Sequence, residues 1–114
     1  MKLLRCGNKG SEKPAALDKK GKIRDLSSSI RDLDPENLNF ETLSKIKKIN
    51  LESLPEISKS TRIGPCVNRP GKFVAIGLNY SDHAAETGVK PPSEPIVFMK
   101  ATSCIVGPND DVII

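Results

Sequence analysis

The sequence lacks tryptophan, long apolar runs and any cysteine framework. Aromatic residues make up 4% of the 114 residues, and no apolar run reaches the roughly 20 residues that a membrane-spanning helix needs. No apolar segment follows the opening MKLLRCG, as it would in a signal peptide. The three cysteines, an odd number without CxxC spacing, are typical of reduced thiols. We therefore expect a cytoplasmic protein with no membrane association.

The charge pattern argues against a nucleic-acid partner. The net charge is +4 and the isoelectric point is about 9.1, but acidic residues are interspersed among the lysines. No aromatic residues alternate with Lys and Arg, as they do on surfaces that bind single-stranded nucleic acid. The apolar content of 37% is enough for a modest core.

The first half of the chain predicts a small sheet. Strand candidates occupy 2–6, 14–18 and 22–26. The last two flank the residues KKG, where Gly21 suits the positive-φ position of a hairpin loop.

A helix is predicted over 40–49, with Asn39 as its N-cap. Apolar residues recur there at three-residue steps and form one stripe, opposite a solvated lysine face: Phe40, Leu43, Ile46 and Ile49. Asp34 followed by Pro35 is a second candidate helix start.

The second half changes character after a stretch rich in proline and glycine. That stretch predicts a linker over 56–71 that runs across a surface. Apolar runs then predict a buried strand ending near Gly77 and three further strands, at 95–100, 104–106 and 112–114. The fold class is therefore α+β, with an N-terminal domain over 1–55 and a second domain over 72–114.

The stretch GLNYSDHAAETG holds the only tyrosine and the only histidine of the chain. A short helix is predicted between about Tyr80 and Thr87, with Asn79 as its cap, Asp82 in capping-box register and a stop at Gly88.

Positions i and i+3 are neighbours on such a helix, so His83 and Glu86 share a face. A carboxylate beside an imidazole fixes its tautomer, which makes the pair a candidate for general-base catalysis.

A structural interpretation of each of these residues is also open. An i,i+3 His–Glu pair is common on exposed helices. Tyr80 and Lys100 are candidates for substrate binding, but a tyrosine more often packs and a lysine after a strand more often faces water. Cys104 is expected to be a small buried hydrophobe.

Three segments together resemble the fumarylacetoacetate hydrolase family. They are MKLLRCGNKGSEKPAALDKKGKIRDLS, RIGPCVNRPGKFVAIGLNYSDHAAETG and PSEPIVFMKATSCIVGPNDDVII, and they cover most of the chain. The pattern is similar to the bacterial branch of smaller proteins, which are 2-hydroxyhepta-2,4-diene-1,7-dioate isomerases, ureidoglycolate lyases or 2,4-diketo-3-deoxy-sugar-acid hydrolases. The opening block looks most like the last of these.

The resemblance implies a metal-dependent hydrolase that cleaves carbon–carbon bonds of 2,4-diketo acids. In such a protein His83 and Glu86 lie on a mobile helical lid and activate water, and Mg²⁺ or Mn²⁺ holds the oxo-acid substrate. A homodimer and a catalytic domain of mixed β-roll type are also implied. Isomerase, decarboxylase or lyase activity is the alternative within the family.

The metal ligands that the family uses are not found in this sequence. They form a Glu-x-Glu pair and a later Asp, which we expect beyond Ile114; Asp110 and Asp111 precede that region and do not match the motif. Family members are also more than twice this length. The chain is therefore expected to be an N-terminal fragment that binds no metal and is inactive alone, or else a non-catalytic remnant that acts as an interaction module.

Overall fold

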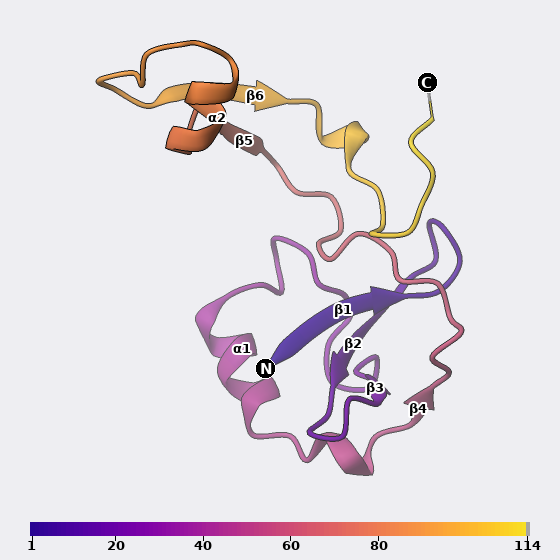
Figure 1. The fold of residues 1–114 in the computed structure, drawn as a ribbon. Coiled ribbons are helices and arrows are strands. Elements are labelled where there is room, and N and C mark those ends of the chain that lie inside the picture. The colour runs from indigo at the N-terminus through magenta and orange to yellow at the C-terminus, as the bar shows by residue number, and fades with distance from the viewer. Residues whose placement is uncertain (114) are drawn as a thin grey trace. The chain divides into compact units, whose positions relative to one another are not determined.

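The computed structural model describes residues 1–113 and divides them into two compact units. The first unit is Met1–Pro70 together with the segment that begins at Ile105, and the second unit is Gly71–Cys104. Figure 1 shows the chain leaving the first unit, forming the second and returning. The domain bounds expected from the sequence stay a prediction.

The first unit is built on a four-stranded antiparallel sheet. Its strands follow one another in the order β1-β2-β3-β4, where β1 is Lys2–Cys6, β2 is Lys13–Leu17, β3 is Ile23–Asp25 and β4 is Glu56–Ile57. The first three confirm the strands predicted from the sequence. Gly21 lies in the turn between β2 and β3 with φ of +74°, which confirms its predicted role.

Both faces of this sheet are covered, so successive residues of β1 and β2 are buried. Leu3 and Ala16 face a core that includes Ile46 of the helix, whereas Leu4 and Ala15 face a second core on the other side. Adjacent strand residues point to opposite faces. Burial on both faces explains why KLLRC and KPAAL show no simple alternation of apolar and polar residues.

Helix α1 (Phe40–Lys47) forms where the periodicity predicted it. The Asn39 side chain accepts a hydrogen bond from the Thr42 N–H at 2.9 Å, which confirms the N-cap. Ile46 is buried, but Phe40 is 92% exposed, so the predicted apolar stripe does not reach the first turn.

Asp34 and Pro35 do not open a helix. The Asp34 carboxylate accepts hydrogen bonds from the backbone and the side chain of Asn37, and the turn ends there. A side chain that accepts from a nearby backbone N–H in this way competes with helical hydrogen bonding.

Part of the predicted linker is bound to the sheet. Besides β4, the N–H of Gly64 donates to the carbonyl of Arg5 and the N–H of Gly7 donates to the carbonyl of Arg62. Cys6 and Ile63 form an isolated bridge between the same two stretches. Residues 62–64 therefore pair with the edge of β1 that does not pair with β2.

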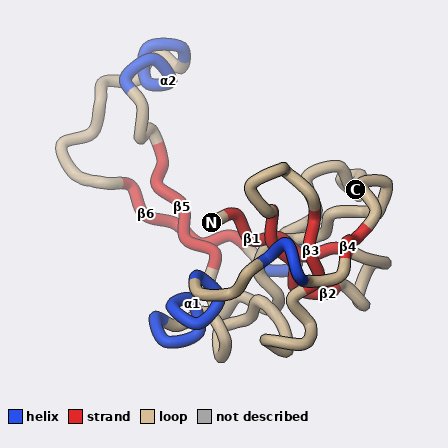
Figure 2. Tube along the Cα trace, turned by 90° about the horizontal axis from the view of Figure 1, so that it is seen from below, coloured by secondary structure: helices blue, strands red, loops and turns tan. Residues whose placement is uncertain are grey.

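The second unit is an antiparallel strand pair and one short helix. Strand β5 (Phe73–Gly77) pairs with β6 (Ile96–Lys100), and helix α2 (Ser81–Glu86) lies in the connection between them. Figure 2 shows α2 beyond the ends of the two strands. Both strands were predicted, but β6 is exposed throughout, and Val74 and Ile76 of β5 are 50% and 41% exposed.

Two predicted strands are wrong. Residues 102–104 form a 3₁₀ turn, 105–106 are irregular, and so are 112 and 113, while Ile114 lies outside the described residues. Cys104 is exposed rather than buried. A strand needs a partner that satisfies its backbone groups, and none of the described residues pairs with these two segments.

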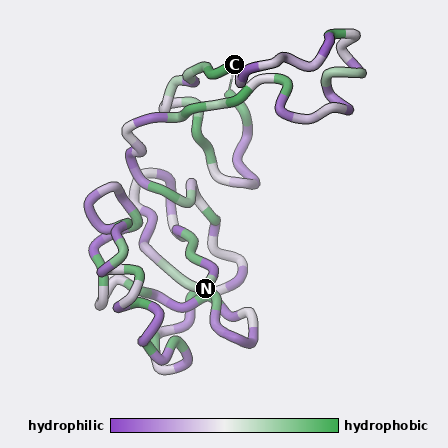
Figure 3. Tube along the Cα trace, turned by 90° about the vertical axis from the view of Figure 1, so that its left-hand side faces the viewer, coloured by the Kyte–Doolittle hydropathy of each residue, from purple (hydrophilic) through white to green (hydrophobic). Residues whose placement is uncertain are grey.

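Hydrophobic and hydrophilic stretches alternate along the trace in Figure 3. Among residues 1–113, neither helix has the length and apolar character that crossing a membrane would require.

Candidate functional site

Helix α2 follows β5 through a strained turn. Leu78 has φ of +47°, a left-handed conformation that is rare for a bulky residue. Such strain concentrates at functional sites, where the surrounding structure holds it in place. The turn determines the residue at which α2 begins. A leucine in the sequence does not predict such a turn.

The predicted cap of α2 is wrong. The N-cap position is Tyr80, which makes no side-chain capping bond, and Asn79 lies one residue before it. The Asp82 carboxylate accepts instead from the backbone N–H of His83, at 2.9 Å. The capping-box register fails because the helix begins one residue later than predicted.

The predicted end of α2 is confirmed. Gly88 has φ of +67°, its N–H donates to the carbonyl of Ala85, and the N–H of Val89 donates to the carbonyl of Ala84. This pair of hydrogen bonds is the Schellman arrangement, which ends a helix with glycine in the left-handed conformation.

His83 and Glu86 lie on this two-turn helix, and both are exposed. Within the described part of the chain, no hydrogen bond or ion pair joins the imidazole to the carboxylate. Positions i and i+3 remain neighbours, so the two groups can meet by side-chain rotation. Their role as a catalytic pair stays a prediction.

Ala84 attaches the helix to its unit. It is 1% exposed and is the only buried residue of α2. A helix that buries one methyl side chain has little packing to hold it, so local opening costs little free energy. This property suits a segment that opens and closes over a substrate.

The two candidate substrate-binding residues are not brought together. Tyr80 is 70% exposed beside α2, whereas Lys100 pairs with Phe73 in the sheet register. The Lys100 ammonium lies over the Phe73 ring, 5.9 Å from its centroid. The α2 connection leaves β5 at Gly77, four residues from Phe73 or about 13 Å along a strand.

A hollow of about 490 Å³ lies beside the start of α2. Leu78, Asn79, Ser81 and Glu94 are among its lining residues, together with three prolines of the segment before β6. His83 and Glu86 do not line it.

A divalent metal has no ligand group in the part of the chain that the structure describes. No three His, Cys, Asp or Glu side chains gather there. Asp110 is held by Arg62, whose Nε donates at 2.7 Å, and by the N–H of Gly107. The Arg62 guanidinium, followed by the Gly107 N–H, lowers the pKa of Asp110. These residues do not fit a magnesium site. The Asp110 carboxylate instead links Arg62 to the turn at Gly107.

Sequence reasoning missed a buried network of charged side chains, here called the arginine network. Arg5, only 4% exposed, donates to both carboxylate oxygens of Asp32, at 2.7 and 3.0 Å. Arg62 donates to the carboxylate of Glu12 at 2.7 Å as well as to Asp110. The only signal in the sequence is a charged residue inside the apolar strand KLLRC.

The arginines hold two of these carboxylates ionised. Burial alone would raise the pKa of Glu12, but the hydrogen bond from Arg62 and the nearby positive charges outweigh it and lower the pKa. Burial likewise acts to raise the pKa of Asp32, and the hydrogen bond and charge of Arg5 lower it overall.

Comparison with known proteins finds long stretches of similar sequence in Burkholderia. Proteins named "Putative hydrolase" are 53% identical over 112 residues in Burkholderia ambifaria and 52% identical in Burkholderia multivorans. The aligned part is 98% of this chain but 40% of each relative. No family model matches the chain. The chain therefore spans well under half the length of these relatives and is similar to part of a hydrolase.

Proposed function

We propose that this chain is part of a metal-dependent hydrolase of the fumarylacetoacetate hydrolase family that cleaves a carbon–carbon bond of a 2,4-diketo acid. The observation that carries the proposal is the exposed pair His83 and Glu86 on a short, weakly anchored helix. The hydrolase names of relatives about 53% identical to this chain support the general reaction type.

His83 acts as the general base in this proposal. Its imidazole accepts a proton from water, and the hydroxide attacks a ketone carbon of the substrate. The bond to the adjacent carbon breaks, and that carbon leaves with the electron pair as an enolate. The imidazolium then returns the proton to the enolate carbon. Glu86 is a positioning residue that orients the imidazole.

Mg²⁺ or Mn²⁺ belongs to the same proposal. When bound, such an ion supplies Lewis-acid stabilisation of negative charge on oxygen. Residues 1–113 offer no ligand group for it, so its ligands are proposed to lie outside them. The homodimer and the cytoplasmic location are further parts of the proposal, and sedimentation of the full-length protein tests the first.

The test uses a chimera in which residues 1–114 replace the matching part of the Burkholderia ambifaria relative. We expect His83→Ala to lower kcat on a 2,4-diketo acid by about 100-fold or more, since general-base catalysis contributes roughly 10²–10⁴-fold. Glu86→Gln is expected to lower kcat less and to leave KM unchanged. Turnover is followed by loss of the diketone absorbance.

Lys90→Ala serves as the matched control, because Lys90 is exposed and lies just after α2. It should retain full turnover. Normal turnover in His83→Ala would remove the catalytic role of the pair. If the parent chimera hydrolysed esters but not diketo acids, the proposed substrate class would be wrong and esters would take its place. Isomerised or decarboxylated product would show the alternative chemistry of the family.

A further inference from the structure

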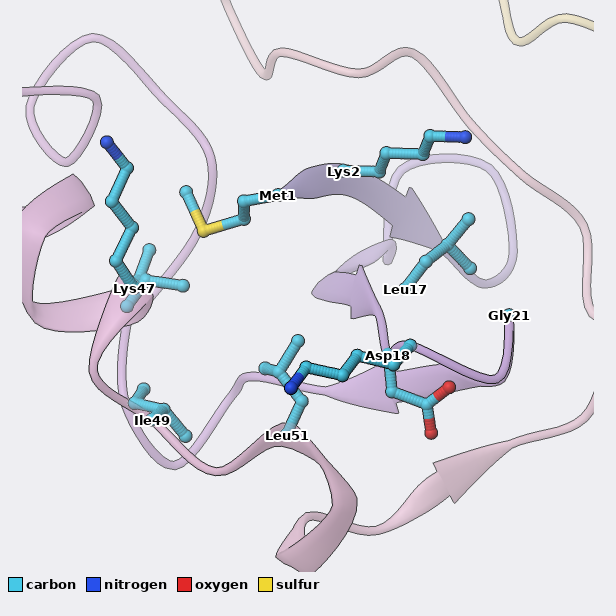
Figure 4. A pocket seen from close by; sticks show the side chains of 10 residues that line it. Met1, Lys2, Leu17, Asp18, Gly21, Lys47, Ile49 and Leu51 are labelled. Carbon is cyan, nitrogen blue, oxygen red and sulfur yellow. The ribbon is translucent and has the colours of Figure 1, made fainter.

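The first unit contains a pocket of about 620 Å³ that the proposed reaction does not use. It lies where β1 begins and β2 and α1 end (Figure 4). Its apolar lining consists of Met1, Leu17, Ile46, Ile49 and Leu51. The volume falls within the range of small-molecule sites, about 300–1,000 Å³.

Three lysines are also among the residues that line this pocket, and in Figure 4 the Lys2 side chain extends away from its centre. Lys2, Lys19 and Lys47 line the pocket, and none of them belongs to an ion pair within residues 1–113. Other lysines of the same unit are paired with carboxylates: Lys20 with Glu52, Lys22 with Glu56 and Lys45 with Glu41. The lysines at the pocket therefore keep their charge available to a ligand.

The one acidic residue among the lining residues does not neutralise these lysines. The Asp18 carboxylate accepts hydrogen bonds from the backbone N–H groups of Lys20 and Lys22, at 2.8 and 2.9 Å. It also accepts from Nε of Arg24 at 2.9 Å, and its side chain is 1% exposed. In Figure 4 the carboxylate points away from the centre of the pocket.

We propose that this pocket binds an amphiphilic carboxylate, a molecule with an aliphatic body and one anionic head. The aliphatic body would cover Leu17, Ile49 and Leu51, which removes apolar surface from water. The carboxylate would stay at the rim, within reach of Lys19 and Lys47. Long lysine side chains can place their ammonium groups at the edge of an apolar surface in this way.

Charge complementarity selects this occupant over the alternatives. A neutral hydrocarbon would leave the three lysines without a counter-charge, and a cationic amphiphile would be repelled by them. A second copy of this chain would bring further positive charge, since the net charge is +4.

The test titrates the 114-residue chain, labelled with ¹⁵N, with octanoate, and uses octylamine as the probe of opposite charge. A purification tag belongs at the C-terminus, because Met1 lines the pocket. We expect octanoate to shift the backbone amide signals of Leu17, Ile46 and Leu51 in a saturable manner. Octylamine should bind at least tenfold more weakly.

Two variants separate the pocket from general surface charge. The double substitution Lys19→Gln with Lys47→Gln should weaken octanoate binding about tenfold. Lys45→Gln is the control, because Lys45 lies on the same helix, is exposed and does not line the pocket. It should leave the affinity unchanged.

Equal binding of the two probes, or equal loss in Lys45→Gln, would overturn the proposal. Shifts confined to the second unit, or pocket signals that change with protein concentration and not with octanoate, would overturn it too. The experiment needs no catalytic activity, so its failure is distinct from failure of the proposed hydrolase function.

Discussion

At the scale of single residues, the two arginines of the arginine network do more for the first unit than its lysines do. The lysines are mostly exposed and form pairs such as Lys45 with Glu41, whose side chains are 72% and 79% exposed. Exposed pairs contribute little because water and salt screen them. Arg5 and Glu12 are by contrast almost fully buried, so loss of one partner leaves a charge in a poorly hydrated place.

Arg5→Met is therefore expected to destabilise the chain strongly. Removing one partner of a buried ion pair costs about 3–5 kcal/mol, and Arg5 is the partner that donates two hydrogen bonds to Asp32. Urea unfolding followed by circular dichroism measures the change. Lys45→Met is the control and should leave the midpoint unchanged. Equal midpoints for the two variants would show that the buried pair does not stabilise the fold.

Acid should weaken the same network. The pKa values of Glu12 and Asp32 are lower in the folded chain than their usual values of 4.5 and 3.8. The unfolded chain therefore binds more protons in this range, so stability is fully present above pH 4.5 and is lost as pH falls through the folded-state pKa values.

The urea midpoint at pH 3 should consequently lie below that at pH 6. Asp32→Asn removes one of the two carboxylates and should flatten this dependence. If the urea midpoint of Asp32→Asn fell between pH 6 and pH 3 as much as that of the parent, other groups would be responsible for the pH dependence.

At the scale of elements, several predictions that rest on local signals agree with the structure, although the Asn79 cap of α2 and the helix start at Asp34 do not. The hairpin turn at Gly21, the Asn39 cap of α1 and the Gly88 end of α2 each depend on residues within five positions of one another. The predictions at 104–106 and 112–114 failed because a strand depends on a distant partner. The left-handed Leu78 could not be predicted, since leucine has no preference for that conformation.

Gly88→Ala should loosen the end of α2. A Cβ at φ of +67° costs about 1 kcal/mol, although no atom lies close enough to clash with it. We expect faster hydrogen exchange at the amides of Gly88's neighbours Thr87 and Val89. Gly71→Ala is the control, because Gly71 has no positive φ and also faces open space. Unchanged exchange in Gly88→Ala would mean that the helix end does not depend on glycine.

At the scale of the whole molecule, sequence reasoning recovered the α+β class and missed what joins distant segments. Arg62 is 50 positions from Glu12 and 48 from Asp110, and no periodicity or turn signal reports contacts of that range. Sequence analysis could propose only part of a candidate site, because it detects residues that are close together in the chain. His83 and Glu86 are three positions apart, whereas metal ligands come from distant positions, and no three His, Cys, Asp or Glu side chains gather among residues 1–113.

The pairing of Arg62 with Asp110 has a consequence for the order of events during synthesis. The second unit, Gly71–Cys104, is an insertion between two stretches of the first. A ribosome adds roughly 5–20 residues per second, so the 48 positions between the partners correspond to about 2–10 seconds. During that interval Arg62 can pair with Glu12 but not with Asp110, so the first unit lacks this ion pair until the residues after the insertion have been made.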